Sequence, residues 1–338
     1  IKYQPKYDDK GNADALRYCM EFYDIKQEVL VVSGDNIVDI SYRDMVEYHK
    51  EKNALLTVGL KEIEGDVSQY GVAVVDEELR LGGFVEKPRR GEEPSKLINT
   101  ALYVFSPEVR EILADMGEKA QDIGRDVVPY LVERGYDVYG YLIKGYWADI
   151  GTPSTYLQTT IDVLSGKVRN IKFNRECHFK NNIWIHPTTV RRLERKDVGE
   201  SLKLEGNVFI GGDCEIDKNV YIKDSCIGDN CIIREGSKII NSIVMDFTNI
   251  ERNSTLNKCI VGRYVTIREN SVIDGELSVD IGEKDPVPVI GDGVIILENS
   301  IIGPAKRVAP VQKSHMILET QKYVELGYDS YNVYFTEK

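Results

Sequence analysis

Hydrophobic and polar residues follow two different patterns along the chain, and the change falls close to residue 167. Before it, segments with the spacing of an amphipathic helix alternate with short apolar runs. The helical segments are 12–23, 41–52, 122–133 and 154–164, and the apolar runs are 28–33, 55–60, 71–75 and 101–105. Strands that alternate with helices predict a layered α/β domain with a mostly parallel sheet.

The first two helical segments carry further signals. In the first, Ala15, Cys19 and Phe22 share one face. The second opens with Ser41, a preferred helix cap, and Asp44 follows three residues later. Both segments are therefore expected to be helices that pack on the sheet.

After residue 168 the helical spacing stops and a repeat of 17 residues begins, with aliphatic residues at intervals of 6, 6 and 5. The aliphatic positions are Ile210, Ile216, Ile222, Ile227, Ile233, Ile239, Val244, Ile250, Leu256, Val261, Ile267, Ile273, Ile290, Ile296 and Ile302. Small residues follow most of them by four positions, as at Cys214, Val220, Cys231, Ser237, Thr248, Ser254, Val265, Ser271, Val294 and Ser300. The pattern predicts a coil with three short sides per turn, each side pointing one aliphatic residue inward. An excursion through Lys284-Asp285-Pro286 interrupts the repeat before its fifth turn.

Charge and cysteine content narrow the class of protein. The 338 residues include 43 Lys and Arg against 55 Asp and Glu, a net charge of −12, which argues against nucleic acid or an anionic membrane as a partner. The six cysteines form no CxxC pair, so we expect reduced, buried thiols in a cytoplasmic protein. Cys214 and Cys231 fall at small positions of the repeat, which indicates packing rather than metal binding.

Two aspartates stand where strands end. Asp35, in Gly34-Asp35-Asn36, follows an apolar strand, at the end of a sheet where α/β proteins bind ligands. Asp149 follows a strand-like segment and precedes a helix that Pro153 starts. Each is equally well explained as a turn or cap residue. Together, with no His or Cys nearby, they favour metal-assisted phosphoryl or nucleotidyl chemistry.

Two further polar residues are candidates for substrate contacts. Lys87, in Phe84-Val85-Glu86-Lys87-Pro88, stands where a strand meets a proline and can hold a phosphate as a point charge. A solvated surface lysine is the competing interpretation. Asn99 can hydrogen-bond a sugar hydroxyl or stabilise a turn.

Six short motifs occur in an order that resembles the sugar-1-phosphate nucleotidylyltransferases, particularly the archaeal-type members that carry a hexapeptide-repeat β-helix. They are Gly11-Asn12-Ala13-Asp14-Ala15, Gly34-Asp35-Asn36, Tyr70-Gly71-Val72, Glu86-Lys87-Pro88, Asn99-Thr100-Ala101-Leu102-Tyr103 and Trp147-Ala148-Asp149-Ile150-Gly151-Thr152-Pro153. The resemblance implies an N-terminal Rossmann-like nucleotidyltransferase domain followed by a left-handed parallel β-helix.

The resemblance also implies roles for particular residues. Asp35 and Asp149 would bind Mg²⁺, and Lys87 would contact the sugar-linked phosphate. Glu86, Asn99 and the backbone at Gly71 would surround the sugar. Gly11 and Asn12 would lie against the nucleotide, and Gly34 is a further substrate-binding residue, next to Asp35. The substrates would be an NTP and a sugar 1-phosphate, and the products an NDP-sugar and pyrophosphate.

The sequence departs from the family at several points. Asn12 stands where the family often has Thr, and Ala101 where it often has Gly. The glycine-rich loop that grips the triphosphate is not found, so we expect the complete protein to be active and residues 1–338 alone to be inactive. We divide the chain into an N-terminally truncated α/β domain (1–166), a left-handed β-helix (167–304) and a C-terminal tail (305–338). Residues 314–326 of the tail have helical spacing and are expected to pack on the solenoid or contact another subunit.

Two other functions fit parts of the sequence. A non-catalytic regulatory or assembly subunit of the same fold would bind a nucleotide-sugar without turnover. Acyl transfer by the β-helix normally needs a histidine base, and no histidine lies between His186 and His315. The solenoid is expected to make the protein a homo-oligomer. The base and the sugar are left open by these residues.

Overall fold

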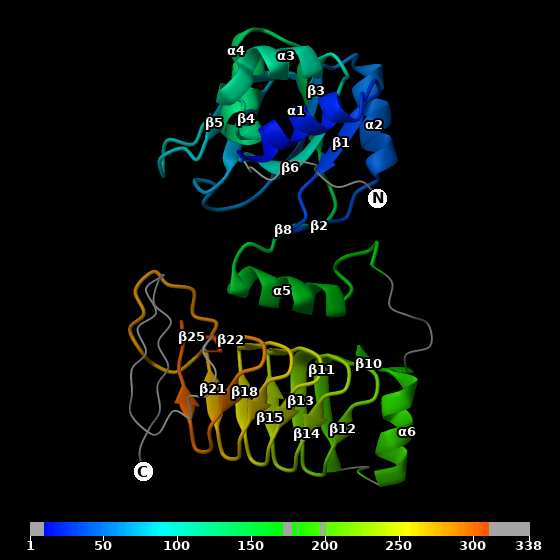
Figure 1. The fold of residues 1–338 in the computed structure, drawn as a ribbon, viewed down its shortest axis with the longest axis vertical. Helices are drawn as coiled ribbons and strands as arrows, with labels where there is room; N and C mark the ends of the chain where they lie inside the picture. The colour runs from blue at the N-terminus through cyan, green and yellow to red at the C-terminus, as the bar shows by residue number, and fades with distance from the viewer. Residues whose placement is uncertain (1–9, 172–177, 181, 197, 199–200, 311–338) are drawn as a thin grey trace. The chain divides into compact units, whose positions relative to one another are not determined.

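The computed structural model describes residues 10–171, 178–180, 182–196, 198 and 201–310. The chain forms two compact units, residues 1–149 and 150–338, which are described separately (Figure 1). In the described residues no helix is long and apolar enough to cross a membrane. The helix expected at 314–326, with most of the 305–338 tail, lies outside the described residues.

The first unit alternates helices and strands. In chain order its elements are α1 (Asn12–Phe22), β1 (Val29–Val32), β2 (Asn36–Val38), α2 (Tyr42–Glu51), β3 (Leu56–Glu62), β4 (Gly71–Val75), β5 (Leu81–Glu86), β6 (Leu97–Phe105), α3 (Val109–Met116), a 3₁₀ turn (Gly117–Lys119), a π-helical turn (Ile123–Val127), α4 (Val128–Glu133), β7 (Val138–Leu142) and β8 (Trp147–Asp149). The main sheet has the order β5-β4-β6-β3-β7, with β1 also paired to β6. Helices α1, α3 and α4 contribute to the core on one face, and α2 covers the other (Figure 1).

The expectation of a mostly parallel sheet is wrong. Among the described pairs of this sheet only β3 and β7 run parallel, and β6 runs antiparallel to β1, β3 and β4. The helical connections do make β1, β3 and β7 parallel to one another, but β6 lies between β1 and β3 in the opposite direction. The link from β4 to β5 is a short turn, which also forces an antiparallel pair.

The first helix forms as predicted, but the face with Ala15, Cys19 and Phe22 is not its buried face. The buried side chains of α1 include Ala13, Leu16 and Met20, whereas Phe22 is 59% exposed. Asp14 lies on the buried face because its carboxylate pairs with Arg17 at 2.6 Å. The second helix forms as expected, and the Ser41 side chain accepts a hydrogen bond from the backbone N–H of Asp44.

In its described residues the second unit is a coil of mostly parallel short strands with two helices. Its elements are α5 (Pro153–Leu164), β9 (His178–Lys180), β10 (Ile183–Ile185), α6 (Pro187–Lys196), β11 (Lys203–Ile210), β12 (Glu215–Ile216), β13 (Tyr221–Ile227), β14 (Ile232–Ile233), β15 (Lys238–Ile240), β16 (Ile243–Val244), β17 (Asn249–Ile250), β18 (Thr255–Asn257), β19 (Ile260–Val261), β20 (Thr266–Ile267), β21 (Val272–Asp274), β22 (Val289–Ile290), β23 (Ile295–Ile296), β24 (Ile301–Ile302) and β25 (Arg307–Val308).

The repeat pattern is confirmed residue by residue. Each strand from β11 to β22 pairs in parallel with a strand one turn later, so Ile233 lies beside Ile250 and Ile250 beside Ile267. All fifteen predicted aliphatic positions are buried, and so are the small residues four positions after them. The α/β fold followed by a parallel β-helix is therefore confirmed.

The cysteines at the corners pack as small residues. The thiol of Cys214 donates to the carbonyl of Gly228 at 3.1 Å, and that of Cys231 to Met245 at 3.3 Å. Thr248 makes the same bond to Gly262 one turn later, at 2.8 Å. Thiol and hydroxyl groups are therefore interchangeable at this corner.

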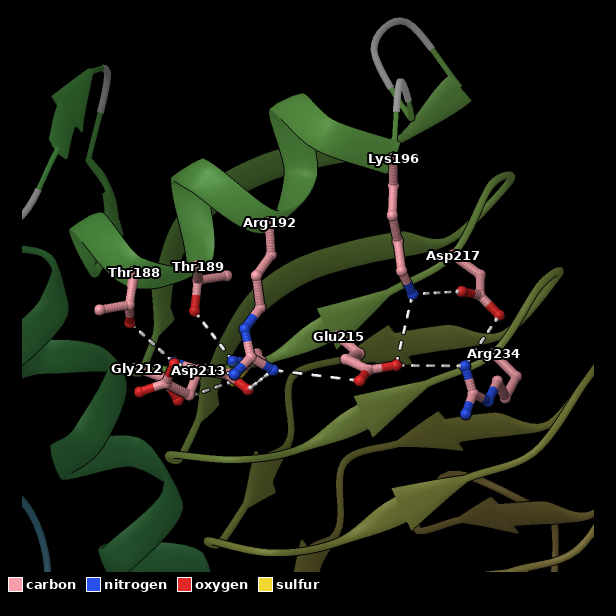
Figure 2. A network of polar contacts seen from close by, with 10 residues as sticks. Thr188, Thr189, Arg192, Lys196, Gly212, Asp213, Glu215, Asp217 and Arg234 are labelled. Atoms are coloured by element: carbon pink, nitrogen blue, oxygen red, sulfur yellow. Dashed lines mark hydrogen bonds and ion pairs between the residues drawn. The ribbon is translucent and has the colours of Figure 1, made fainter.

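Helix α6 is an element that the sequence pattern did not predict, and it replaces part of a first turn of the coil. Thr189 of α6 donates its hydroxyl to the carbonyl of Gly211 and accepts from the N–H of Cys214, as the corner residues of later turns do. Figure 2 shows Arg192 and Lys196 reaching the next turn. Their acidic partners are Asp213, Glu215 and Asp217, the last two of which Arg234 also contacts. Val190 and Leu193 of α6 also pack against the core of the coil, but two apolar residues in a ten-residue helix give little periodicity.

Candidate functional site

Two strand ends bring Asp35 and Asp149 to the same place. Strand β2 pairs with β8 in antiparallel register, with Asn36 opposite Asp149. Asp35 is in the turn directly before Asn36 and is exposed. The two aspartates are 114 positions apart in the sequence, so this pairing alone makes them neighbours.

Oxygen atoms around this pairing form a donor set suited to a hard cation. The Asn36 side-chain nitrogen donates to the carbonyl of Thr100 at 3.3 Å. Its oxygen is buried and has no hydrogen-bond partner within the described chain. Two carboxylates and an amide oxygen are ligands that Mg²⁺ accepts, usually with water and phosphate oxygens completing the shell.

Tyr70 lies between this donor set and a second cluster of polar residues. Its ring contacts Trp147 edge to face, with centroids 5.7 Å apart. Burial, with a smaller contribution from the Asp149 carboxylate, raises the pKa of Tyr70. The carbonyl of Tyr70 accepts the backbone N–H of Lys87 at 3.1 Å. The hydrogen bond between Lys87 and Tyr70 thus links the second cluster to the donor set.

The second cluster is built on Glu86. Gly71 of β4 pairs with Glu86 of β5, and a Cβ on Gly71 would lie 2.6 Å from Glu86 Oε2. The glycine is therefore what admits the carboxylate. Burial raises the pKa of Glu86, and the negative charge of Asp122 adds to that effect, whereas Lys87 and Arg125 oppose it.

Asn99 meets Glu86 beside the π-helical turn. A Cβ on Gly124 would lie 3.2 Å from Asn99 Nδ2 and 3.3 Å from Glu86 Oε2, so both side chains border this glycine. Asn99 Nδ2 also donates to the Tyr103 hydroxyl at 2.7 Å. Tyr103 is buried, which raises its pKa. The cluster around Glu86 thus also contains an amide and a phenol hydroxyl.

Asp122, at the start of the π-helical turn, also belongs to this second cluster. Its Oδ1 accepts the backbone N–H of Arg125 at 2.8 Å, and its Oδ2 accepts the Asn12 side-chain amide at 3.1 Å. The Asn12 oxygen in turn accepts the N–H of Ile123 at 2.7 Å. Gly11 has a φ of 110°, and any Cβ there would overlap the carbonyl of Gln121. Gly11 and Asn12 are thus packed against the segment that carries Asp122.

Lys87 has a strained backbone next to the cluster. Its φ of 47° is unusual for a residue with a Cβ, and Pro88 follows it. Such conformations concentrate at functional positions, because the surrounding structure must hold them. The side chain is exposed and close enough to Glu86 to lower its pKa.

The structure thus brings together the predicted residues in two adjoining clusters and adds three that the prediction did not assign: Asp122, Tyr103 and Asn36. Asp122 starts a predicted helix, so only its capping role was visible. Tyr103 and Asn36 occur within the quoted motifs, and their presence there was the available signal. In the described residues no group of three or more His, Cys, Asp or Glu side chains forms a metal cluster.

An α/β domain with carboxylates at its strand ends and a polar cluster bordered by glycines is typical of nucleotide- and phosphate-handling enzymes. Comparison with known families agrees: the model described as "Nucleotidyl transferase" matches residues 1–166, and that described as "GMPPB C-terminal domain" matches residues 204–318.

Similar proteins point to one family. A UTP–glucose-1-phosphate uridylyltransferase of Synechocystis sp. is 31% identical over 268 residues, which is 78% of this chain and 67% of the relative. A glucose-1-phosphate adenylyltransferase of Desulfitobacterium hafniense is 30% identical over 306 residues, 88% of this chain and 74% of the relative. The chain belongs to the sugar-1-phosphate nucleotidylyltransferases. Its reaction class is transfer of a nucleotidyl group from an NTP to a sugar 1-phosphate, giving an NDP-sugar, and enzymes of this family generally use a divalent metal.

Proposed function

We propose that Asp35 and Asp149 hold the divalent ion, that this ion is Mg²⁺, and that Asn36 supports the same site. The pairing of Asn36 with Asp149 is the observation that carries the proposal. The unpartnered Asn36 oxygen and the all-oxygen donor set suit Mg²⁺. The ion would neutralise charge on the phosphate oxygens.

We assign the sugar 1-phosphate to the second cluster, around Glu86. The Glu86 and Asp122 carboxylates accept hydrogen bonds from sugar hydroxyls, and the Asn99 amide and Tyr103 hydroxyl complete the set. Gly71 leaves room for the ring, and Lys87 attracts the phosphate. Two neighbouring carboxylates favour a neutral, hydroxyl-rich sugar over an acidic one.

The nucleotide is assigned to the side of Gly34, Gly11 and Asn12. The relatives are named for glucose 1-phosphate with UTP or ATP, so these are the first substrates to test. In the reaction an oxygen of the sugar phosphate bonds to the α-phosphorus of the NTP. The bond from that phosphorus to the bridging oxygen breaks, and pyrophosphate leaves.

The chain's organisation follows from this assignment. We take residues 1–166 as the catalytic domain, 167–304 as the β-helix and 305–338 as the tail, although α5 (Pro153–Leu164) belongs by its contacts to the second compact unit. The family models that end at 166 and begin at 204 support the first boundary. The described cysteines are free thiols, which suits the cytoplasm, where the substrates are also found.

The test is pyrophosphate release by the complete protein with Mg²⁺, for the wild type, Asp35→Asn and Asp149→Asn. We expect each variant to lose about 10²–10³-fold in kcat, because each removes a charge that holds the ion. Asp44→Asn, an exposed aspartate of α2, is the matched control and should retain activity. Full activity in both site variants would refute the metal assignment.

A binding measurement separates the proposal from a non-catalytic subunit. Calorimetric titration with glucose 1-phosphate and with the NDP-sugar should show binding that weakens in Glu86→Gln. Binding of the NDP-sugar without any turnover by the complete protein would favour the regulatory alternative.

A further inference from the structure

One corner of the β-helix carries a row of residues whose backbone is left-handed. Each of the strands β11, β13, β16, β19 and β22 is followed by a turn, and the row consists of the second residue of each of these turns. Its members are Asp213, Asn230, Phe247, Tyr264 and Gly293, with φ between 56° and 72°. Glycine, asparagine and aspartate adopt this conformation readily, but bulky side chains rarely do. Phe247 and Tyr264 are therefore the unusual members of the row.

The two aromatic side chains project into solvent. Phe247 is 47% exposed and Tyr264 is 61% exposed. Their rings stack in parallel, with centroids 5.0 Å apart and planes inclined by 6°. Because the rings use one face on each other, they do not form a flat platform of the kind that binds a sugar ring.

The residue before each of the two aromatic residues is charged. Asp246 precedes Phe247 and Arg263 precedes Tyr264, and both side chains are partly exposed. Within the chain they meet only loosely, at 3.9 Å between Arg263 Nε and Asp246 Oδ2. The patch formed by Asp246, Phe247, Arg263 and Tyr264 thus has an acidic–aromatic half and a basic–aromatic half on adjacent turns.

We propose that this corner patch is an interface with a second copy of the same chain. A two-fold axis that lies between the two turns, at right angles to the solenoid axis, reverses the order of turns in the partner. It sets Phe247 against the partner's Tyr264 and Asp246 against the partner's Arg263. The symmetry repeats both contacts, so the patch is complementary to itself. Exposed aromatic residues flanked by a pair of opposite charges are typical of such an interface.

Charge reversal tests the proposal directly. Arg263→Asp alone places acid against acid in the homodimer, and Asp246→Arg alone places base against base. We expect each variant alone to be monomeric in light scattering after size-exclusion chromatography. A mixture of the two variants restores both ion pairs across the interface, so its mass should return to that of the wild-type dimer. A contact within one chain cannot produce this rescue.

Two further variants test the aromatic contact and control for the change of charge. Phe247→Asn with Tyr264→Asn puts in both places the residue that Asn230 supplies one turn earlier, so the coil should keep its melting temperature while association is lost. Arg268→Asp makes the same charge change away from the patch, where Arg268 pairs with Glu251 at 2.8 Å, and should leave association unchanged. A wild-type monomer, an oligomer that survives all patch variants, or no heterodimer in the mixture would each overturn the proposal.

Discussion

Gly71→Ala adds a single methyl group beside Glu86 and so tests whether the cluster around Glu86 binds the sugar. The backbone of Gly71 is outside the left-handed region, so alanine can adopt its conformation. The added Cβ would lie 2.6 Å from Glu86 Oε2 and 2.5 Å from Phe84 Cζ, both closer than real Cβ contacts allow. The phenyl ring and the carboxylate must both move, and the carboxylate is the group assigned to the sugar.

The size of the effect follows from the bonds that the carboxylate would make. A hydrogen bond to a charged group contributes about 1.5–3 kcal/mol. Displacing Glu86 from one sugar hydroxyl should therefore weaken binding of the sugar 1-phosphate by about 10- to 150-fold. Nucleotide binding should change little, because no nucleotide contact is assigned to Gly71.

Calorimetric titration with glucose 1-phosphate, and separately with the NTP, measures both expectations. Gly82→Ala is the matched control, since Gly82 is on the neighbouring strand β5 and a Cβ there meets nothing within 4 Å. Melting temperatures check that both variants fold. Unchanged sugar-phosphate affinity in folded Gly71→Ala would show that Glu86 does not bind the sugar.

Three further predictions concern stability and pH. Ile250→Ala, deep in the solenoid, should lower the free energy of unfolding in urea by about 2–5 kcal/mol, whereas Ile295→Ala, at a position 59% exposed, should change it by less than about 0.5 kcal/mol; similar losses would contradict the inward assignment. Thr189→Val removes the buried hydroxyl that joins α6 to the coil and should cost about 1–3 kcal/mol in the same assay, and a neutral result would mean that α6 is held mainly by its ion pairs and by Val190 and Leu193. Because the folded pKa of Glu86 is raised above its ordinary value of 4.5, its contribution to stability is complete below 4.5 and is lost as pH rises through the folded pKa. Glu86→Gln should remove that loss, and a stability–pH curve identical to the wild type would refute the shift.

The solenoid was predictable because its rule is local and repeated. Each side needs one inward aliphatic residue and each corner a small one, so the spacing of Ile233, Ile250 and Ile267 along the chain is enough to identify their common face. Helix α6 escaped prediction for the opposite reason. It contacts the coil through the polar side chains of Thr189, Arg192 and Lys196 and through only two apolar residues, Val190 and Leu193, which are too few to mark a helical period.

The strand directions of the first unit were not predictable from alternation alone. Alternating strands and helices correctly indicate that β1 and β3 run in the same direction. They do not reveal that β6, far along the chain, enters between them in the opposite direction. The position of β6 depends on how all strands of the sheet pair with one another, which is a property of the whole sheet rather than of any segment.

The same distinction explains what could be known of the site. Gly71 and Glu86 are close in sequence and belong to one antiparallel pair, so a motif on each strand suffices to suggest that they meet. Asn36 and Asp149, by contrast, meet only through β2 and β8, and Asn12 reaches Asp122 across 110 positions. A one-residue slip in either long-range contact would separate groups that the motifs name, while leaving every motif intact. The identity of the residues therefore indicates the chemistry, but the long-range register is what creates the site, and substitutions that shift register should abolish binding without touching a motif residue.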